Sequence, residues 1–232
     1  MNLSSLRWDR RARSTPARRL GPAFSNRLAT VLQVTVLLLA AAVAMPGCRR
    51  AEPAAGLALP DAVIDLDGHR WTLREPGLRG VALVFYLQDC PVANGYAPRI
   101  ERLHEEFAGR SVRLLVVQAD PRASVETLRQ HAREHRWTVP VVADPRHELV
   151  RSAGATSAPQ AIVWDARGRR VYSGRIDDQF VDWGKKRPEP ARHDLRDVLE
   201  KLAEGRELAA ATTPVVGCYL KDLRPIPTPP AR

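Results

Sequence analysis

Cys90 is the residue of this chain whose position best suits thiol chemistry. It follows an apolar run at 81–87 (VALVFYL) and precedes Pro91. Proline has no N–H to donate and its fixed φ suits the first turn of a helix, so we expect Cys90 at a helix N-terminus. Unpaired N–H groups and the helix dipole favour a thiolate there, and the thiolate is the nucleophile in disulfide exchange and peroxide attack. The alternative is an inert buried cysteine.

No second thiol stands close to Cys90 in the sequence. The third residue after it is Ala93 and the fourth is Asn94, so a local Cys-x-x-Cys switch and a copper-binding Cys-x-x-x-Cys site both lack one sulfur. His131 and His135 are four residues apart on a predicted helix, but no third ligand accompanies them. We therefore predict solvated helix residues, no metal site and no cofactor.

Cys218 is the second thiol of the expected folded part. It lies far downstream, in the Pro-rich tail 207–232, within the apolar stretch PVVGCYL. Such a tail can fold back, and a resolving thiol must come within disulfide geometry of the attacking one. Three roles remain open for Cys218: the resolving partner of Cys90, a partner in a structural or intermolecular disulfide, or a free thiol.

Strands and helices alternate between residues 61 and 206, which we expect to form one domain. A hairpin is predicted over 62–73, with Asp67-Gly68 in its turn. Apolar runs predict buried strands, and amphipathic or capped stretches predict helices. The strands are expected at 81–87, 112–118, 139–144, 160–165 and 169–176, and the helices at 97–110, after Ser124, around 146–153 and at 193–205. This order predicts a three-layer α/β/α fold with a mixed central sheet and an N-terminal β-hairpin.

Residues 1–47 are expected to form an export signal. They contain seven arginines and one acid, and supply +6 of the net charge of +10. The apolar run 31–44 is short for a membrane span, which needs about 20 residues, and is typical of a signal peptide. An uncleaved N-terminal anchor is the alternative. With most of the charge in this segment, the composition does not predict nucleic-acid binding.

Cys48 stands where a bacterial lipoprotein is cleaved and lipidated. Gly47 fits that interpretation, although Met45 and Pro46 depart from the usual pattern, and plain secretion is the alternative. Residues 48–60 are small and Pro-containing, as in a flexible tether. We therefore expect an exported protein of the periplasm or cell envelope, anchored to a membrane by its N-terminus. Export would place Cys90 in an oxidising compartment.

Two segments, VFYLQDCPVANGY (84–96) and SAPQAIVWDARGRRVYSGRIDD (157–178), resemble thioredoxin-fold redoxins. The resemblance covers about 60–206 and is closest to the peroxiredoxin-like branch of the AhpC/TSA and redoxin group. It implies a thioredoxin-like fold, with Cys90 as the reactive thiol and Pro159 as a cis-proline. Pro91, Pro159 and Arg175 would shape the substrate groove, and Arg175 would otherwise pair with a neighbouring acid, Asp177 or Asp178. The run Tyr172-x-Gly174-Arg175-Ile176-Asp177-Asp178 also matches this subgroup.

The sequence departs from true peroxiredoxins at the groups that polarise peroxide. Leu87 replaces the hydroxyl residue three positions before the cysteine, and Leu83 replaces the proline before that. Pro159 aligns with the arginine that peroxiredoxins place at the late strand. The resemblance therefore implies a thiol–disulfide oxidoreductase or a thiol peroxidase, with a disulfide or peroxide substrate and a thiol reductant as partners. The rival is a non-catalytic thioredoxin-fold module that binds a partner or a metal.

Overall fold

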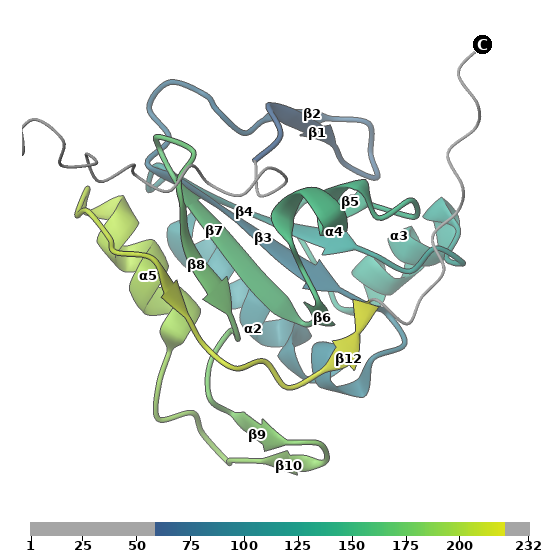
Figure 1. Ribbon diagram of the computed structural model, residues 1–232. Helices are drawn as coiled ribbons and strands as arrows, with labels where there is room; N and C mark the ends of the chain where they lie inside the picture. The colour runs from purple at the N-terminus through teal and green to yellow at the C-terminus, as the bar shows by residue number, and fades with distance from the viewer. Residues whose placement is uncertain (1–58, 221–232) are drawn as a thin grey trace, which may run out of the picture. The chain divides into compact units, whose positions relative to one another are not determined.

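A mixed six-stranded sheet forms the centre of the computed structural model, which describes residues 59–220 (Figure 1). The strand order is β11–β8–β7–β3–β4–β5. Strands β3, β4 and β5 run parallel, β7 is antiparallel to both β3 and β8, and β11 is parallel to β8. The bounds are β3 Gly80–Tyr86, β4 Val112–Gln118, β5 Val141–Ala143, β7 Gln160–Asp165, β8 Arg170–Gly174 and β11 Ala211–Thr212.

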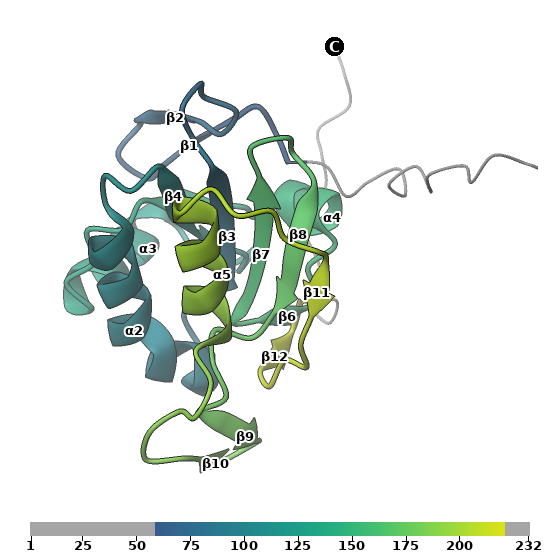
Figure 2. The same ribbon diagram turned by 90° about the vertical axis from the view of Figure 1, so that its left-hand side faces the viewer.

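Helices cover both faces of this sheet, which confirms the three-layer prediction. They are α2 (Pro91–Phe107), α3 (Val125–Glu134), α4 (Glu148–Ala153) and α5 (Asp194–Ala203). The connections β3–α2–β4 and β4–α3–β5 step across the sheet in the same direction, so the right-handed crossover rule places α2 and α3 on one face. Figure 2 shows α5 on that face too and α4 on the other.

The core lies between the sheet and these helices. All seven residues of β3 are buried, which explains why the sequence shows a continuous apolar run there and no alternation. The predicted apolar face of α2, formed by Ile100, Leu103 and Phe107, is buried against the sheet. Burial of a side chain of this size contributes roughly 1.5–3 kcal/mol to stability.

Helix ends follow the sequence signals, with one difference. The Ser124 hydroxyl accepts a hydrogen bond from the Thr127 N–H (3.1 Å) and begins α3, as predicted. Gly154 ends α4 with a φ of 71°, which glycine adopts without strain. Helix α2 starts at Pro91, as expected from the Cys90–Pro91 pair, and continues through Pro98 to Phe107, whereas the amphipathic pattern in the sequence covers only 97–110. Pro98 is exposed and forfeits one helical hydrogen bond.

Within residues 59–220, three short two-stranded sheets surround the core. The predicted hairpin is present as β1 (Ala62–Ile64) and β2 (Arg70–Thr72). A second hairpin, which the sequence does not predict, consists of β9 (Phe180–Asp182) and β10 (Lys185–Lys186). It projects at the end of the domain that carries the amino end of α2 (Figures 1 and 2). The third sheet joins β6 (Ser157–Ala158) to β12 (Cys218–Tyr219).

The segment after α5 is built onto the domain. The sequence predicts no elements between 207 and 220, but β11 extends the main sheet and β12 pairs with β6. We call residues 211–220 the C-terminal strap. The expected signal segment 1–47, Cys48 and most of the tether lie outside the described residues. Within 59–220, no helix combines the length and the hydropathy needed to cross a membrane.

Candidate redox site

Cys90 lies where the carboxyl end of β3 meets the amino end of α2. It is the N-cap residue of α2, with extended backbone, and Pro91 is the first helical residue. Its side chain is only 1% exposed, because the strap and the loop before β7 cover it. The central strand thus delivers the thiol to the sheet edge at which sites of open α/β folds form.

The sulfur of Cys218 reaches Cys90 from the strap. The Cys218 thiol donates a hydrogen bond to the Cys90 sulfur, with 2.7 Å between the two atoms. Both cysteines are free thiols in this state. Since a disulfide bond is about 2.05 Å long, the two sulfurs need to approach each other by less than one ångström. The structure therefore brings together two thiols that are 128 positions apart in the sequence.

The loop before β7 forms the wall beside this pair. The Cys90 thiol lies 3.4 Å from the carbonyl oxygen of Ala158, and the Ala158–Pro159 peptide bond is cis. Of the predicted groove residues, Pro91 and Pro159 therefore lie next to Cys90. Arg175 does not: its Nε is 2.8 Å from Asp194, rather than from either of the neighbouring acids Asp177 and Asp178.

Backbone pairing holds the end of the strap against this wall. Strand β12 is antiparallel to β6, with Cys218 opposite Ala158 and Tyr219 opposite Ser157. The N–H of Leu220 then donates to the carbonyl of Thr156 (2.9 Å). The Leu220 side chain is fully buried and belongs to the main apolar core. The strap is thus anchored on the C-terminal side of Cys218.

A second anchor lies upstream of Cys218, at Thr213. Its N–H donates to the Ser173 carbonyl (3.1 Å), and its hydroxyl is 2.7 Å from the Tyr172 hydroxyl. The N–H of Arg175 donates to the same Thr213 oxygen (3.1 Å). A β-carbon on Gly174 would overlap the Thr213 side chain. The first part of the Tyr172–Asp178 run therefore has a structural role that the sequence does not reveal, which is to hold the strap.

The remainder of that run ties α2 and α5 to the segment that follows β8. The Ile176 carbonyl accepts from the N–H of Leu195 at the start of α5 (3.0 Å). Asp177 is buried, accepts from the Tyr96 hydroxyl (2.8 Å) and pairs with Arg99 (2.9 Å), so that it fastens α2. These contacts fix the amino ends of α2 and α5 relative to each other.

Asp178 fixes the loop that precedes α5. Its carboxylate accepts from the backbone N–H groups of Ala191 (2.7 Å) and Arg192 (2.9 Å). These hydrogen bonds favour the charged form and hold the pKa of Asp178 below its usual range. The Asp178 carboxylate therefore holds this loop in place.

Asn94, one turn after Cys90, is the centre of a polar network. Its side-chain oxygen accepts from the Tyr86 hydroxyl (2.7 Å) and lies 3.0 Å from Nε2 of His131, and its amide donates to the Gln88 carbonyl (2.7 Å). Because an amide oxygen only accepts, His131 carries a proton on Nε2. Asn94, which stands where a Cys-x-x-x-Cys site would have its second cysteine, thus has a structural role.

The histidine pair differs from the prediction at one of its members. His131 is buried rather than solvated, and its ring lies 4.5 Å from that of His135. Burial, and then the charge of His135, lower the pKa of His131. Among residues 59–220, no group of three or more histidine, cysteine or acidic side chains is placed to hold a metal ion.

Cys218 does not ionise readily in this environment. Burial, the hydrogen bond to Cys90 and the charge of Cys90 together raise the pKa of Cys218 to about 12. Cys218 therefore keeps its proton at neutral pH, as its role as donor in the S–S contact requires. Burial, and then the charge of Cys90, also raise the pKa of the nearby Tyr86 hydroxyl.

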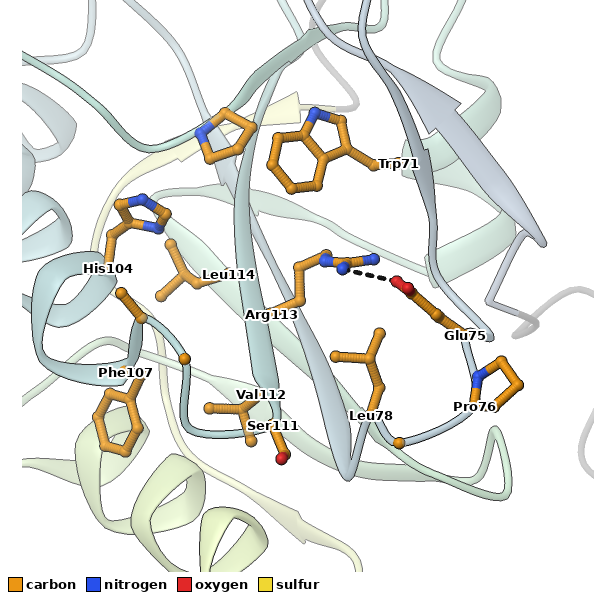
Figure 3. A pocket seen from close by; sticks show the side chains of 14 residues that line it. Trp71, Glu75, Pro76, Leu78, His104, Phe107, Ser111, Val112, Arg113 and Leu114 are labelled. Atoms are coloured by element: carbon orange, nitrogen blue, oxygen red, sulfur yellow. Dashed lines mark hydrogen bonds and ion pairs between the residues drawn. The ribbon is translucent and has the colours of Figure 1, made fainter.

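A surface pocket at the other end of the sheet offers no comparable chemistry (Figure 3). It opens where β3 and β4 begin, between Trp71, Leu78 and His104. Its most prominent charge, Arg113, pairs with Glu75 (2.8 Å) and stacks over Trp71. The charged group of Arg113 is therefore already partnered within the protein.

Comparison with known proteins identifies the family. The AhpC/TSA family profile matches residues 51–172, which is more than half of the chain. The chain belongs to the AhpC/TSA family. A curated relative, the thiol-disulfide oxidoreductase ResA of Halalkalibacterium halodurans, is 26% identical over 121 residues, covering 51% of this chain and 67% of ResA. The predicted family is therefore confirmed.

Solved structures agree on the fold. A hypothetical protein of Sinorhizobium meliloti is 20% identical and superposes with a TM-score of 0.62, covering 73% of this chain and 95% of that protein. A putative thioredoxin of Neisseria meningitidis is 15% identical with a TM-score of 0.51, covering 64% and 91%. The thioredoxin-like α/β fold predicted from the sequence is therefore confirmed.

Proposed function

We propose that this AhpC/TSA-family protein is a thiol–disulfide oxidoreductase in which Cys90 attacks the substrate and Cys218 resolves the product. The single observation that supports this most strongly is the 2.7 Å separation of the two sulfurs. Resolution of a mixed disulfide within one chain requires a second thiol within bonding reach of the first. Cys218 meets that requirement where Ala93 and Asn94 leave no local partner.

The exchange takes place in two steps. The Cys90 thiolate attacks one sulfur of a substrate disulfide, forms a mixed disulfide, and releases the other substrate sulfur as a thiolate. Cys218 then gives up its proton and attacks the Cys90 sulfur, which releases the second substrate thiolate. The substrate gains two electrons and the Cys90–Cys218 pair loses two. An external dithiol reductant restores the pair by the same chemistry.

The order of attack follows from the proton on Cys218. Because Cys218 donates to Cys90, the Cys90 sulfur is the acceptor in this contact and Cys218 holds the shared proton. Cys218 itself, whose pKa is raised to about 12, is a poor nucleophile until Cys90 has formed the mixed disulfide with the substrate. Cys90 therefore attacks first and Cys218 second.

Disulfides suit this site better than peroxide does. Leu83 and Leu87 are buried apolar residues in the places where peroxiredoxins carry the groups next to their thiol. The place of the peroxidase arginine is taken by Pro159, and the charged group of Arg175 is bound to Asp194. No group that would polarise an O–O bond accompanies the thiol among these positions.

The proposed setting is outside the cytoplasm. It rests on the expected export signal at 1–47 and on Cys48 as a lipid attachment site, which would tether the domain to a membrane. In an oxidising compartment, the reductant would have to be another membrane-associated or exported dithiol protein.

Trapping of the mixed disulfide tests the proposal. The full-length protein and its Cys90→Ser and Cys218→Ser variants are incubated with a disulfide-containing peptide and analysed by mass spectrometry after acid quenching. We expect a peptide linking Cys90 and Cys218 in the wild type and a stable peptide adduct mapped to Cys90 in Cys218→Ser; adducts at Cys48, or at Cys218 in Cys90→Ser, should form more slowly than the one at Cys90. Oxidation of Cys90 by peroxide but not by the peptide would favour a peroxidase. Inertness of Cys90 toward both would support the non-catalytic module.

A further inference from the structure

The strap occupies the place that a bound polypeptide would take beside Cys90. Strand β12 pairs with β6 as an antiparallel neighbour, directly before the cis-proline, and Figure 1 shows it as the yellow arrow beside β6. Peptide recognition by strand addition uses this arrangement, in which main-chain hydrogen bonds give affinity and side-chain pockets give selectivity. The strap therefore shows which residues the edge of β6 accepts.

Side chains alternate along the strap, as they do in any strand. Cys218 and Leu220 point inward, to the Cys90 sulfur and to the core, while Tyr219 is 60% exposed between them. A strand in this register presents a cysteine to Cys90 and buries the residue two positions later. The residue directly after the cysteine is not selected by burial.

The residue before the cysteine is restricted by space. A β-carbon on Gly217 would overlap the Ala158 carbonyl oxygen and lie 3.2 Å from Cδ of Pro159. No positive φ is involved, so close approach of the two backbones is the reason for glycine at this position. A strand with any larger residue there has to stand away from β6, which would draw its cysteine away from Cys90.

The residue two positions after the cysteine is restricted by burial. Leu220 is 0% exposed and lies in the apolar core. Removing most of a buried leucine leaves a cavity, and a charged side chain cannot enter the same place without a partner. A large aliphatic residue is therefore preferred there.

From these contacts we infer that the edge of β6 selects polypeptide disulfides whose cysteine lies in a Gly-Cys-x-Leu-like segment, and that the strap is the chain's own occupant of this edge. The inference rests on the proposed function, since Cys90 must react. Cys90 is 1% exposed beneath the strap, so a polypeptide sulfur reaches it only when residues 214–220 leave. The anchor at Thr213 lies outside that segment and keeps the strap close.

Resolution and product release then become one event. The substrate strand and the strap compete for the same edge of β6, so both cannot be paired with Ala158 at once. When the strap returns, Cys218 attacks the Cys90 sulfur, the Cys90–substrate bond breaks, and the substrate leaves as a thiolate from an edge that is already being refilled. The electron balance is that of the two-step exchange described above.

Activated peptides test the inference. The probe copies residues 214–220, Pro-Val-Val-Gly-Cys-Tyr-Leu, as a mixed disulfide with thionitrobenzoate; two control peptides carry Val for Gly or Asp for Leu. The protein is full-length with Cys218→Ser and Leu220→Asp, so that the strap is released and cannot resolve. We expect Cys90 to release thionitrobenzoate from the copied peptide about tenfold faster than from either control, which corresponds to one steric or burial penalty of about 1.4 kcal/mol.

The small disulfide of thionitrobenzoate serves as the reference reactant. If Cys90 reacts with it but takes the three peptides at equal rates, this inference is overturned while the proposed function stands. If Cys90 reacts with neither, the proposed function fails. Should Leu220→Asp not fold, judged by circular dichroism, Gly217→Val in the Cys218→Ser background displaces the strap through the Ala158 contact instead. Equal peptide rates in that variant overturn the inference equally.

Discussion

The side chain of Thr213 fills the space that a β-carbon on Gly174 would need. Its hydroxyl contacts the Tyr172 hydroxyl (2.7 Å) and accepts from the N–H of Arg175 (3.1 Å). This fit fastens the upstream end of the strap to β8, and the strap in turn delivers Cys218 to Cys90. We therefore expect the pairing of the two thiols to depend on a contact made five positions before Cys218 in the sequence.

Gly174→Ala is expected to slow formation of the Cys90–Cys218 disulfide. Displacing Thr213 loosens the strap and lowers the effective concentration of Cys218 at Cys90, by about tenfold or more. The measurement is the rate of disulfide formation after addition of an oxidised dithiol, followed by alkylation and mass analysis. Thr212→Ala, at the exposed neighbouring position, is the matched control and should form the bond at the wild-type rate. An unchanged rate in Gly174→Ala would show that the anchor is dispensable.

Asn94→Leu is expected to destabilise the fold by about 2 kcal/mol or more, because the Tyr86 hydroxyl and the His131 N–H lose their acceptor in a buried place. Urea unfolding of the reduced protein measures the change. Gln130→Ala, which removes exposed hydrogen bonds with Glu134 and Arg133 on α3, should stay within about 0.5 kcal/mol of wild type. Equal effects of the two substitutions would mean that the Asn94 network contributes little.

The pH dependence of Cys218 alkylation should shift when Cys90 is replaced. A raised pKa means less thiolate at a given pH, so in the reduced wild type the rate at Cys218 should still be rising from about pH 9 to about pH 11. Cys90→Ala removes the hydrogen bond and the charge and leaves burial, so the pKa of Cys218 falls and its alkylation at pH 8 becomes faster. Peptide mapping assigns the label. A profile that does not move would show that burial alone raises the pKa.

Arg175 distinguishes a structural role from a role in the groove. Arg175→Gln breaks the partly buried pair with Asp194 and should lower the free energy of unfolding by about 1 kcal/mol. Its backbone N–H still holds Thr213, so the rate at which Cys90 reacts with a peptide disulfide should stay within about twofold of wild type. Asp194→Asn is the matched control for loss of the pair. A large loss of rate in Arg175→Gln alone would place its guanidinium on the substrate.

Strong local signals explain why most of the fold is predictable from the sequence. Continuous apolar runs mark β3 and β4, Ser124 marks the start of α3, and the spacing of leucines marks the buried face of α5. The position of Cys90 at the amino end of α2 follows from the buried strand before it and the proline after it. These features depend on residues that are neighbours in the chain.

The strap is not predictable in the same way. Its strands are two residues each, and they are defined by partners at Ser173 and Ala158 rather than by any pattern of their own. The apolar stretch around Cys218 indicates that the tail docks somewhere, but not on which edge. The burial of His131 is missed for a similar reason, since Trp137 and Tyr86 cover it from other elements.

Counting thiols at redox equilibrium tests most directly whether Cys90 and Cys218 work as a pair. The full-length protein is equilibrated with mixtures of reduced and oxidised dithiothreitol, quenched in acid, alkylated and mapped by mass spectrometry. We expect Cys90 and Cys218 to lose their free thiols together, in a single two-electron transition, and a peptide linking the two to appear in proportion. Oxidation of Cys90 while Cys218 stays free at every ratio would contradict this expectation.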